Sequence, residues 1–196
     1  MKKQLILVAS PPACGKTYVS KMIAKELKHI VYLDKDDLCD IVRAGFAAAG
    51  QELDMDGSFY KENIRSAEYS TILNIAFSTL QFEDKVILNA PFGKEVRDTE
   101  YMKKLKEKAN QNGAELLLVW VTAPVSVCYE RMKKRASDRD TLKLENWDEY
   151  VKKINYSPPY QLKEAGAVDR FFVFDSKDDA SVRSSLNEVL KMLLGE

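Results

Sequence analysis

The sequence predicts an α/β protein in which helices flank a five-stranded parallel sheet, giving three layers. Short β-rich apolar runs alternate with longer stretches of helical period, and this alternation is typical of βαβ units. At 196 residues the chain is long enough for one well-buried domain and short for two, so we expect a single domain over residues 1–196. The predicted strands are LILVA (5–9), IVYL (30–33), VILNA (86–90), ELLLVWV (115–121) and RFFVF (170–174).

Helices are predicted in the stretches between these strands. Apolar residues recur at helical spacing from Lys16 to Lys28, directly after Gly15. A helix after the second strand is expected near its acidic residues, and Gly113 marks a plausible helix end. The predicted helices are 16–28, 36–44, 58–82, 96–112, one that begins at Thr122 and Pro124, and about 179–194.

Charge and hydropathy exclude several classes of partner. The 30 Lys and Arg residues balance the 30 Asp and Glu residues, so no overall charge attracts nucleic acid or an anionic membrane. No apolar run approaches ~18 residues, and the N-terminal run LILVA is better explained as a buried strand than as a signal peptide. We therefore expect a cytoplasmic protein with no nucleic-acid or membrane partner.

The cysteines predict a reducing compartment and no zinc site. Cys14, Cys39 and Cys128 are odd in number, scattered, and accompanied by a single histidine. Cys39 and Cys128 lie in apolar-rich segments and are expected to be small core residues. Cys14 lies in the loop considered next.

Residues 10–17, SPPACGKT, nearly match the phosphate-binding pattern G-x-x-x-x-G-K-[ST], with Ser10 in place of the first glycine. Pro11 and Pro12 lack a backbone N–H, but they precede the donors that such a loop needs and stiffen its entry. The alternative is a strand-to-helix turn with a solvated Lys16. The loop follows an apolar strand and opens an amphipathic helix, which favours phosphate binding. The expected phosphate-binding residues are Ala13, Cys14, Gly15, Lys16 and Thr17.

An acidic cluster follows the second strand, in the stretch YLDKDDL (32–38). Its side chains should emerge at the carboxyl edge of the sheet, beside the loop. One aspartate there could accept the proton of an attacking hydroxyl. Asp34 or Asp36 could instead cap the following helix. Both roles are compatible if different residues fill them.

With these motifs in place, the chain resembles the small P-loop kinases of the adenylate-kinase-like group. Within that group it especially resembles the AAA-labelled ATP-binding proteins that are similar to zeta toxin, chloramphenicol phosphotransferase and gluconate kinase. The resemblance implies a P-loop NTPase fold and covers about the first three quarters of the chain. The matching stretches are SPPACGKT, YLDKDDL, VILNAPFGKEVR (86–97) and VWVTAPVSVCYERMKKRASDRD (119–140).

The resemblance assigns roles to individual residues. It implies that Lys16 contacts the β- and γ-phosphates of ATP and that Thr17 ligates Mg²⁺. It aligns Asp36 with the acid that binds the acceptor hydroxyl and acts as base, with Asp34 as the second choice. Arg43 could hold the acceptor, although Cys39 occupies the place nearer to the aspartate where the family usually has its arginine.

An arginine-bearing lid is expected at about residues 131–145. Arg131, Arg135 and Arg139 follow a spacing of four and would share one face if they were on one helix. The resemblance makes this segment the lid, with Arg131 and Arg135 first among the residues that neutralise charge on the transferring group. The alternative is a solvated basic helix end.

Asn89 is the main departure from the family pattern. The third strand of such kinases commonly ends in an aspartate that helps hold the magnesium water shell, whereas an amide adds no negative charge. Asp34 or Asp36 would then be the remaining acids for the metal. Arg97 matches a family position with either a substrate or a structural role. Trp147, Tyr150 and Tyr156 are expected to pack rather than to stack on a ligand.

The sequence thus predicts a kinase that binds ATP and Mg²⁺ and phosphorylates a small acceptor with a hydroxyl or phosphate group. An ATP-binding regulatory module with little turnover is the alternative, which Ser10 and Asn89 motivate. A GTPase is disfavoured because no N-K-x-D sequence is present. The acceptor is not specified, and a monomer or a homodimer is equally compatible.

Overall fold

A computed structural model describes residues 2–195, without the side chains of residues 138, 139 and 142. Five parallel strands form one sheet in the order β2-β3-β1-β4-β5. This confirms the predicted strands and their parallel arrangement. The strands are β1 (Lys3–Ala9), β2 (Ile30–Asp34), β3 (Lys85–Asn89), β4 (Ala114–Thr122) and β5 (Arg170–Asp175).

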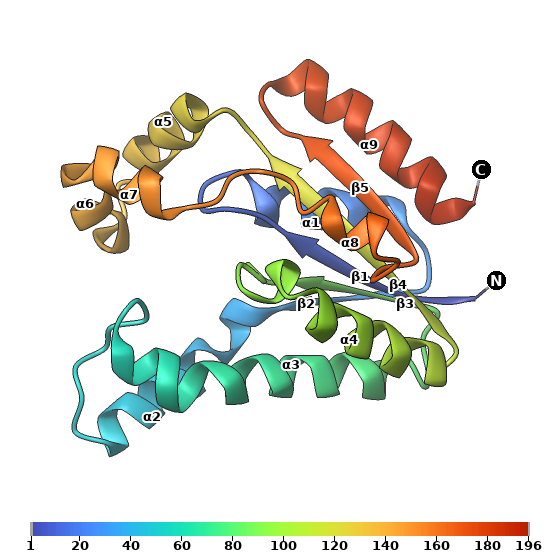
Figure 1. Cartoon of the computed structure of the whole chain (residues 1–196), viewed down its shortest axis with the longest axis horizontal. Helices are drawn as coiled ribbons and strands as arrows, with labels where there is room; N and C mark the ends of the chain where they lie inside the picture. Colours follow the sequence, from blue (N-terminus) through green and yellow to red (C-terminus); the bar gives the residue numbers. More distant parts are fainter. Residues whose placement is uncertain (1, 196) are drawn as a thin grey trace.

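Helices cover both faces of the sheet and complete the three layers that were predicted (Figure 1). Side chains alternate along a strand, so Leu5 and Leu7 face one layer while Ile6 and Val8 face the other, and all four are fully buried. On the first face pack α3 (Arg65–Thr79), α4 (Thr99–Gln111) and α8 (Gln161–Glu164). On the second face pack α1 (Lys16–Glu26), α9 (Asp179–Leu194) and part of α5 (Val125–Arg135).

Three predicted helices begin later than their sequence pattern indicated. The segment 36–44 starts with a 3₁₀ turn (Lys35–Leu38) and continues as α2 (Cys39–Ala48), because the Asp34 side chain accepts a hydrogen bond from the Asp36 backbone. The segment 58–82 starts with a π-helical turn (Tyr60–Ile64) before α3. The predicted helix 96–112 begins at Thr99, because the Asp98 side chain caps it by accepting from the Tyr101 amide.

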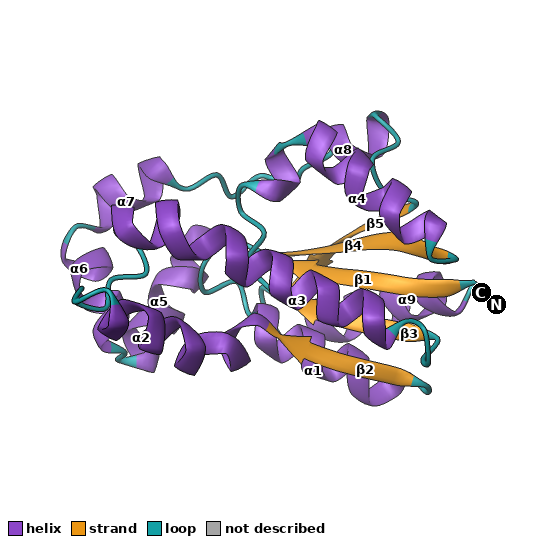
Figure 2. Ribbon diagram, turned by 90° about the horizontal axis from the view of Figure 1, so that it is seen from below, coloured by secondary structure: helices purple, strands orange, loops and turns teal. Residues whose placement is uncertain are grey.

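The carboxyl end of the sheet carries the segments relevant to function. The short helices α6 (Asp138–Glu145) and α7 (Trp147–Lys153) follow α5 and gather at this end together with α2 (Figure 2). Within residues 2–195, no helix combines the length and the apolar character needed to cross a membrane.

Candidate active site

The loop after β1 has the backbone conformation of a tight anion-binding turn, and Ser10 does not obstruct it. The residues with positive φ are Ala13 (61°) and Gly15 (92°), whereas Ser10 has no positive φ. The Ser10 hydroxyl donates to the Pro11 carbonyl oxygen at 2.7 Å. The conformational freedom of glycine is thus not needed at position 10.

The positive φ of Gly15 favours glycine at this position, and close neighbours leave little room for a side chain. A Cβ atom there would lie 3.2 Å from Ser176 Oγ and 3.4 Å from Arg131 Nη1. Helix α1 begins at the next residue, Lys16, and no side chain caps its N-terminus. Amide groups at an uncapped helix start favour an anion. The loop therefore fits the phosphate cradle expected from the sequence.

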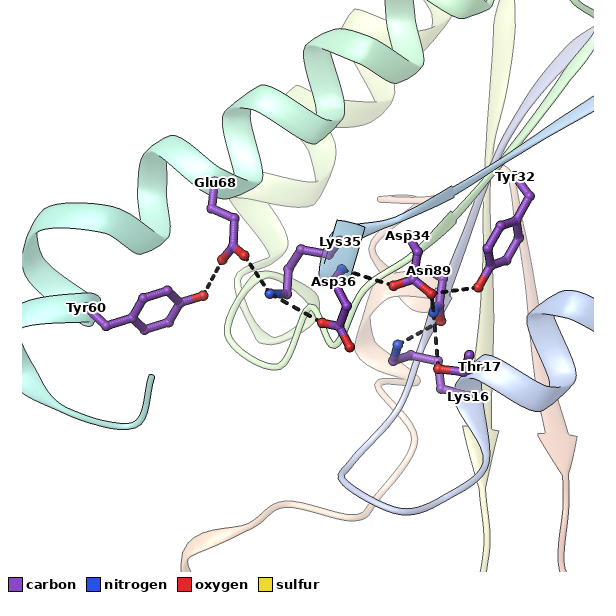
Figure 3. Close-up of polar contacts among 9 residues, drawn as sticks. All are labelled: Lys16, Thr17, Tyr32, Asp34, Lys35, Asp36, Tyr60, Glu68 and Asn89. Carbon is purple, nitrogen blue, oxygen red and sulfur yellow. Dashed lines mark hydrogen bonds and ion pairs between the residues drawn. The ribbon is translucent and has the colours of Figure 1, made fainter. Parts of the chain in front are cut away.

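Asn89, at the end of β3, is the centre of a hydrogen-bonded network that joins the end of β2 to the first turn of α1 (Figure 3). Its Oδ1 accepts from Lys16 Nζ at 2.7 Å. Its Nδ2 donates to Asp34 Oδ2 at 2.7 Å and lies 3.2 Å from Thr17 Oγ1. Sheet register brings these residues together, because Asn89 is paired with Val8 of β1 on one side and with Asp34 of β2 on the other.

Asp34 is held as a carboxylate inside this network. Burial raises its pKa, but the hydrogen bonds from the Asp36 amide, the Tyr32 hydroxyl and the Asn89 amide, together with the charge of Lys16, lower its pKa below the ordinary 3.8. The Tyr32 hydroxyl donates to Asp34 Oδ2 at 2.8 Å. Burial and this carboxylate raise the pKa of Tyr32 to about 12, so Tyr32 stays a donor at neutral pH.

The geometry gives a physical reason for the amide at position 89. An aspartate there would place a second carboxylate against Asp34, where Asn89 Nδ2 now lies 2.7 Å from Asp34 Oδ2. Two carboxylates at such a distance repel each other and one must take up a proton. One negative charge is therefore present in this network, on β2 rather than on β3, and it lies near the Thr17 hydroxyl.

Asp36 lies beside this network, and its carboxylate contacts Lys35 (Figure 3). Its side chain is 61% exposed, and its Oδ1 lies 3.8 Å from Lys35 Nζ. Lys35 is itself buried and its Nζ contacts Glu68 Oε1 of α3 at 2.8 Å. The Tyr60 hydroxyl donates to the other carboxylate oxygen of Glu68. This chain of contacts anchors the turn that presents Asp36 (Figure 3).

Removing one partner of the buried pair of Lys35 and Glu68 is expected to destabilise the fold strongly. Replacing Glu68 by Ala should lower the free energy of unfolding by about 3–5 kcal/mol, because it leaves a buried ammonium without its partner. The Glu68 side chain is 1% exposed and that of Lys35 is 6% exposed. Urea unfolding followed by circular dichroism measures the change. The matched double variant Lys35→Met with Glu68→Gln should recover most of the loss, and a loss below about 1 kcal/mol for Glu68→Ala would contradict this expectation.

The two first-choice lid arginines are placed very differently. Arg131 Nη1 donates to Ser176 Oγ at 3.1 Å, next to Gly15, and its Nη2 donates to the Ser176 carbonyl oxygen. Arg135 instead forms an ion pair with the buried Asp140 of α6, with Nη2 to Oδ2 at 2.6 Å. Arg131 thus lies at the phosphate loop, whereas Arg135 holds α5 to α6.

The expected row of three arginines on one helix does not form. Helix α5 ends at Arg135, because the next residue, Ala136, has a left-handed φ of 46°, and Arg139 belongs to α6. The side chain of Arg139 lies outside the described part of the chain.

Two further predicted residues have other contacts. Arg43 is 65% exposed and pairs with Asp40 of its own helix at 3.5 Å; among the contacts of the described residues, none joins it to the Asn89 network. Arg97 stacks over Trp120, with its guanidinium carbon 5.1 Å from the ring centroid, and donates to the carbonyl oxygens of Asn155 and Ser157. These contacts give Arg97 a structural role.

The aromatic residues that follow the predicted lid segment pack against other side chains, as expected. Trp147 contacts Tyr129 and Tyr150 with ring centroids 4.9 and 5.7 Å apart. Tyr156 packs against the core between the sheet and α1. Burial raises the pKa of both Tyr150 and Tyr156.

Sequence reasoning missed Tyr32, Glu68 and Ser176. Ser176 directly follows β5, and the position after a parallel strand is a signal that could have drawn attention to it. Glu68 is an acidic residue on the buried face of a helix, which is also a recognisable signal. Tyr32 reads as an ordinary strand residue, and only the fold shows that its hydroxyl reaches Asp34.

Fold and site together define a P-loop NTPase domain with the architecture of the small kinases. A family model described as AAA domain (AAA_33) matches residues 5–156, which is more than half of the chain. The chain belongs to this family, and nucleotide binding is a property that the family implies. A search of curated proteins finds no match.

Solved structures with the same fold include several kinases. A candidate kinase from Chloroflexus aurantiacus superposes with a TM-score of 0.67 at 18% identity, covering 100% of this chain and 98% of the other. Shikimate kinase from Bacteroides thetaiotaomicron gives 0.52 at 16% identity and covers 100% of both chains. Kti12 from Chaetomium thermophilum, solved in complex with ADP-AlF3, gives 0.57 at 18% identity, covering 94% and 96%. At these identities the likeness establishes the fold.

Proposed function

We propose that this protein is an ATP-dependent kinase that transfers the γ-phosphoryl group to a small acceptor with a hydroxyl or phosphate group. The observation that carries the proposal is the Asn89 network, which brings Lys16, Thr17 and Asp34 together at the phosphate loop. An exposed carboxylate, Asp36, lies directly beside it. This combination offers an anion site, a hydroxyl and carboxylate for Mg²⁺, and a base.

The oxygen donors present fit Mg²⁺, which prefers hard oxygen ligands and keeps several of its waters. The Thr17 hydroxyl would ligate the ion, and the Asp34 carboxylate would accept hydrogen bonds from its waters. Within the described residues, no cluster of three acidic, cysteine or histidine side chains offers a cage for a metal. A Mg²⁺ site with few protein ligands takes its remaining ligands from phosphate oxygens and water. When bound, MgATP supplies the electrophilic γ-phosphoryl group.

Different residues of the chain would position the phosphates, neutralise their charge and accept the proton of the acceptor. The loop amides and Lys16 position the phosphates, and Arg131 lies at the same loop and adds positive charge. Asp36 accepts the proton of the acceptor hydroxyl as the new phosphorus–oxygen bond forms and the bond to the departing ADP oxygen breaks. Its exposure leaves room for an acceptor to approach.

An acceptor screen tests the proposal. ADP formation is measured with nucleosides, nucleotides, sugar acids, amino sugars and aminoglycoside- or phenicol-like compounds, with Lys16→Ala as the blank. Thermal shift identifies compounds that bind without being phosphorylated. ADP formation that depends on the acceptor and occurs with the wild type but not with Lys16→Ala supports the proposal. Binding of ATP with no turnover in the whole panel would instead support a regulatory module, the second candidate, which the amide of Asn89 favours.

The Lys16→Ala variant should bind MgATP about tenfold more weakly or worse, because hydrogen bonds to charged groups contribute about 1.5–3 kcal/mol each. Isothermal titration calorimetry measures the affinity. Lys25→Ala is the matched control, since Lys25 is an exposed lysine in the last turn of the same helix. Equal affinities of the two variants would contradict a phosphate contact for Lys16.

A further inference from the structure

Two cysteine thiols that no catalytic role uses meet beneath the phosphate loop. Cys14 Sγ, from the loop, lies 3.5 Å from Cys128 Sγ, from α5. Both residues are fully buried and neither forms a disulfide. They are far apart in sequence, so tertiary structure alone brings them together. Cys39, the third cysteine, is only half-buried.

Cys14 contacts α5 directly through its side chain and indirectly through its backbone, by way of Ser176. The Ser176 hydroxyl donates to the Cys14 carbonyl oxygen. Arg131, one helical turn after Cys128, donates to the same Ser176 hydroxyl at 3.1 Å. A change in the distance between Cys14 and Cys128 must therefore disturb the contacts of Arg131 and Ser176 with the loop.

The surroundings favour reaction at Cys128. The hydrogen bond with Cys14 and the nearby Arg131 charge lower the pKa of the Cys128 thiol despite its burial. The hydrogen bond with Cys128 and burial raise the pKa of Cys14. The pair thus combines one thiol that ionises more readily with a second thiol in contact, an arrangement found at redox-sensitive sites.

We propose that Cys14 and Cys128 form a reversible disulfide that weakens nucleotide binding. The oxidant is a peroxide. The Cys128 thiolate attacks one peroxide oxygen and the O–O bond breaks, giving a sulfenic acid on Cys128 and releasing hydroxide. The Cys14 thiol then displaces that hydroxyl, which leaves as water, and the sulfur–sulfur bond forms. A dithiol reductant returns both cysteines to thiols.

The inhibition follows from the crowding around the loop. Bond formation shortens the sulfur separation from 3.5 Å to about 2.05 Å. Gly15 has little room for this movement, because a Cβ atom added there would lie only 3.2 Å from Ser176 Oγ and 3.4 Å from Arg131 Nη1. The shift must therefore displace the amides of Cys14 and Gly15, which are the groups predicted to bind phosphate.

Burial of both sulfurs makes the reaction depend on loop opening. Peroxide reaches the thiols only when the loop moves away from α5. Nucleotide, which holds the loop in place, should slow disulfide formation. This part rests on the proposed nucleotide binding, whereas the contact between the two thiols does not.

The experiment compares protein treated with hydrogen peroxide and protein kept reduced. Intact mass should fall by two hydrogens, and peptide mapping should join the Cys14 and Cys128 peptides. ADP affinity, measured by calorimetry, should fall about tenfold or more after oxidation, as expected for losing one or two hydrogen bonds to charged phosphate, and dithiothreitol should restore it. ADP added before peroxide should slow the mass change.

Cysteine variants distinguish the effect of the Cys14–Cys128 disulfide from the effect of oxidation elsewhere in the protein. Cys128→Ser should bind ADP like the reduced wild type and should not respond to peroxide, and Cys128→Ala provides the same test if serine is poorly tolerated in the core. Cys39→Ser is the matched control and should respond like the wild type. Absence of the Cys14–Cys128 peptide, or its presence with unchanged ADP affinity, would overturn the proposal. Reduced protein that fails to bind ADP would overturn the proposed function instead, while the peptide map still decides the disulfide.

Discussion

Replacing Asp36 by Asn should lower kcat about 10³-fold and leave MgATP affinity within about twofold of wild type, since a positioned general base contributes roughly 10²- to 10⁴-fold. The amide side chain keeps the size of the carboxylate but cannot accept the acceptor proton. The contact that Asp36 makes with the Asn89 network comes from its backbone N–H, which donates to Asp34 Oδ1 at 3.1 Å and survives the substitution. Loss of turnover without loss of nucleotide binding is therefore the signature of this residue.

Steady-state kinetics with the acceptor found in the screen, combined with calorimetry for MgATP, measures both quantities. Asp37→Asn is the matched control, because Asp37 is the neighbouring exposed aspartate of the same turn. Its kcat should stay near that of the wild type. Full turnover by Asp36→Asn would show that Asp36 is not the base, and would leave Asp34 as the candidate.

Replacing Asp34 by Asn should reduce kcat/KM on the order of 10²-fold and raise the Mg²⁺ concentration needed for half-maximal activity, because groups that orient a metal's ligands contribute roughly 10- to 100-fold. Because position 89 is already an amide, the Asp34→Asn variant has no carboxylate left in the network that contains Lys16 and Thr17. The amide can still accept from Tyr32, so the loss reflects charge more than geometry.

A charge exchange sharpens this test. Asn89→Asp combined with Asp34→Asn moves the carboxylate onto β3, against Lys16, whose Nζ now lies 2.7 Å from Asn89 Oδ1. We expect the double variant to recover at least about tenfold of the lost activity, within the range that metal-orienting groups contribute. Asn89→Asp alone should be impaired, because it places two carboxylates in contact. A double variant as inactive as Asp34→Asn would show that position 34, and not the charge, is what the reaction requires.

The lowered pKa of Asp34 also predicts a dependence of stability on pH. Its folded pKa is below the ordinary 3.8, so the ionised carboxylate stabilises the fold above the unfolded value. That contribution is lost as the pH falls through the folded pKa. Below about pH 4, the unfolding midpoint of the wild type should therefore fall more steeply with pH than that of Asp34→Asn. Parallel curves would show that Asp34 is not held as a carboxylate.

The strands and the phosphate loop were predictable because their signals are local. Apolar runs such as LILVA are buried on both faces wherever helices cover a parallel sheet, and the glycine-lysine pattern fixes its own backbone turn. Helix starts were less predictable. The capping of α4 by Asp98 and the π-helical turn before α3 depend on individual hydrogen bonds that compete with helical periodicity.

The sequence by itself determined the fold class, the loop at residues 10–17 and the candidate acids in residues 32–38. Each of these was recognised from a pattern of residues close together in the chain. Only the tertiary structure decided how distant residues combine. Sheet register pairs Asn89 with Asp34, and the Asn89 amide forms hydrogen bonds with both Asp34 and Lys16. Packing of α5 under the loop brings Cys128 to Cys14. Such contacts join residues many positions apart, and no local pattern encodes them.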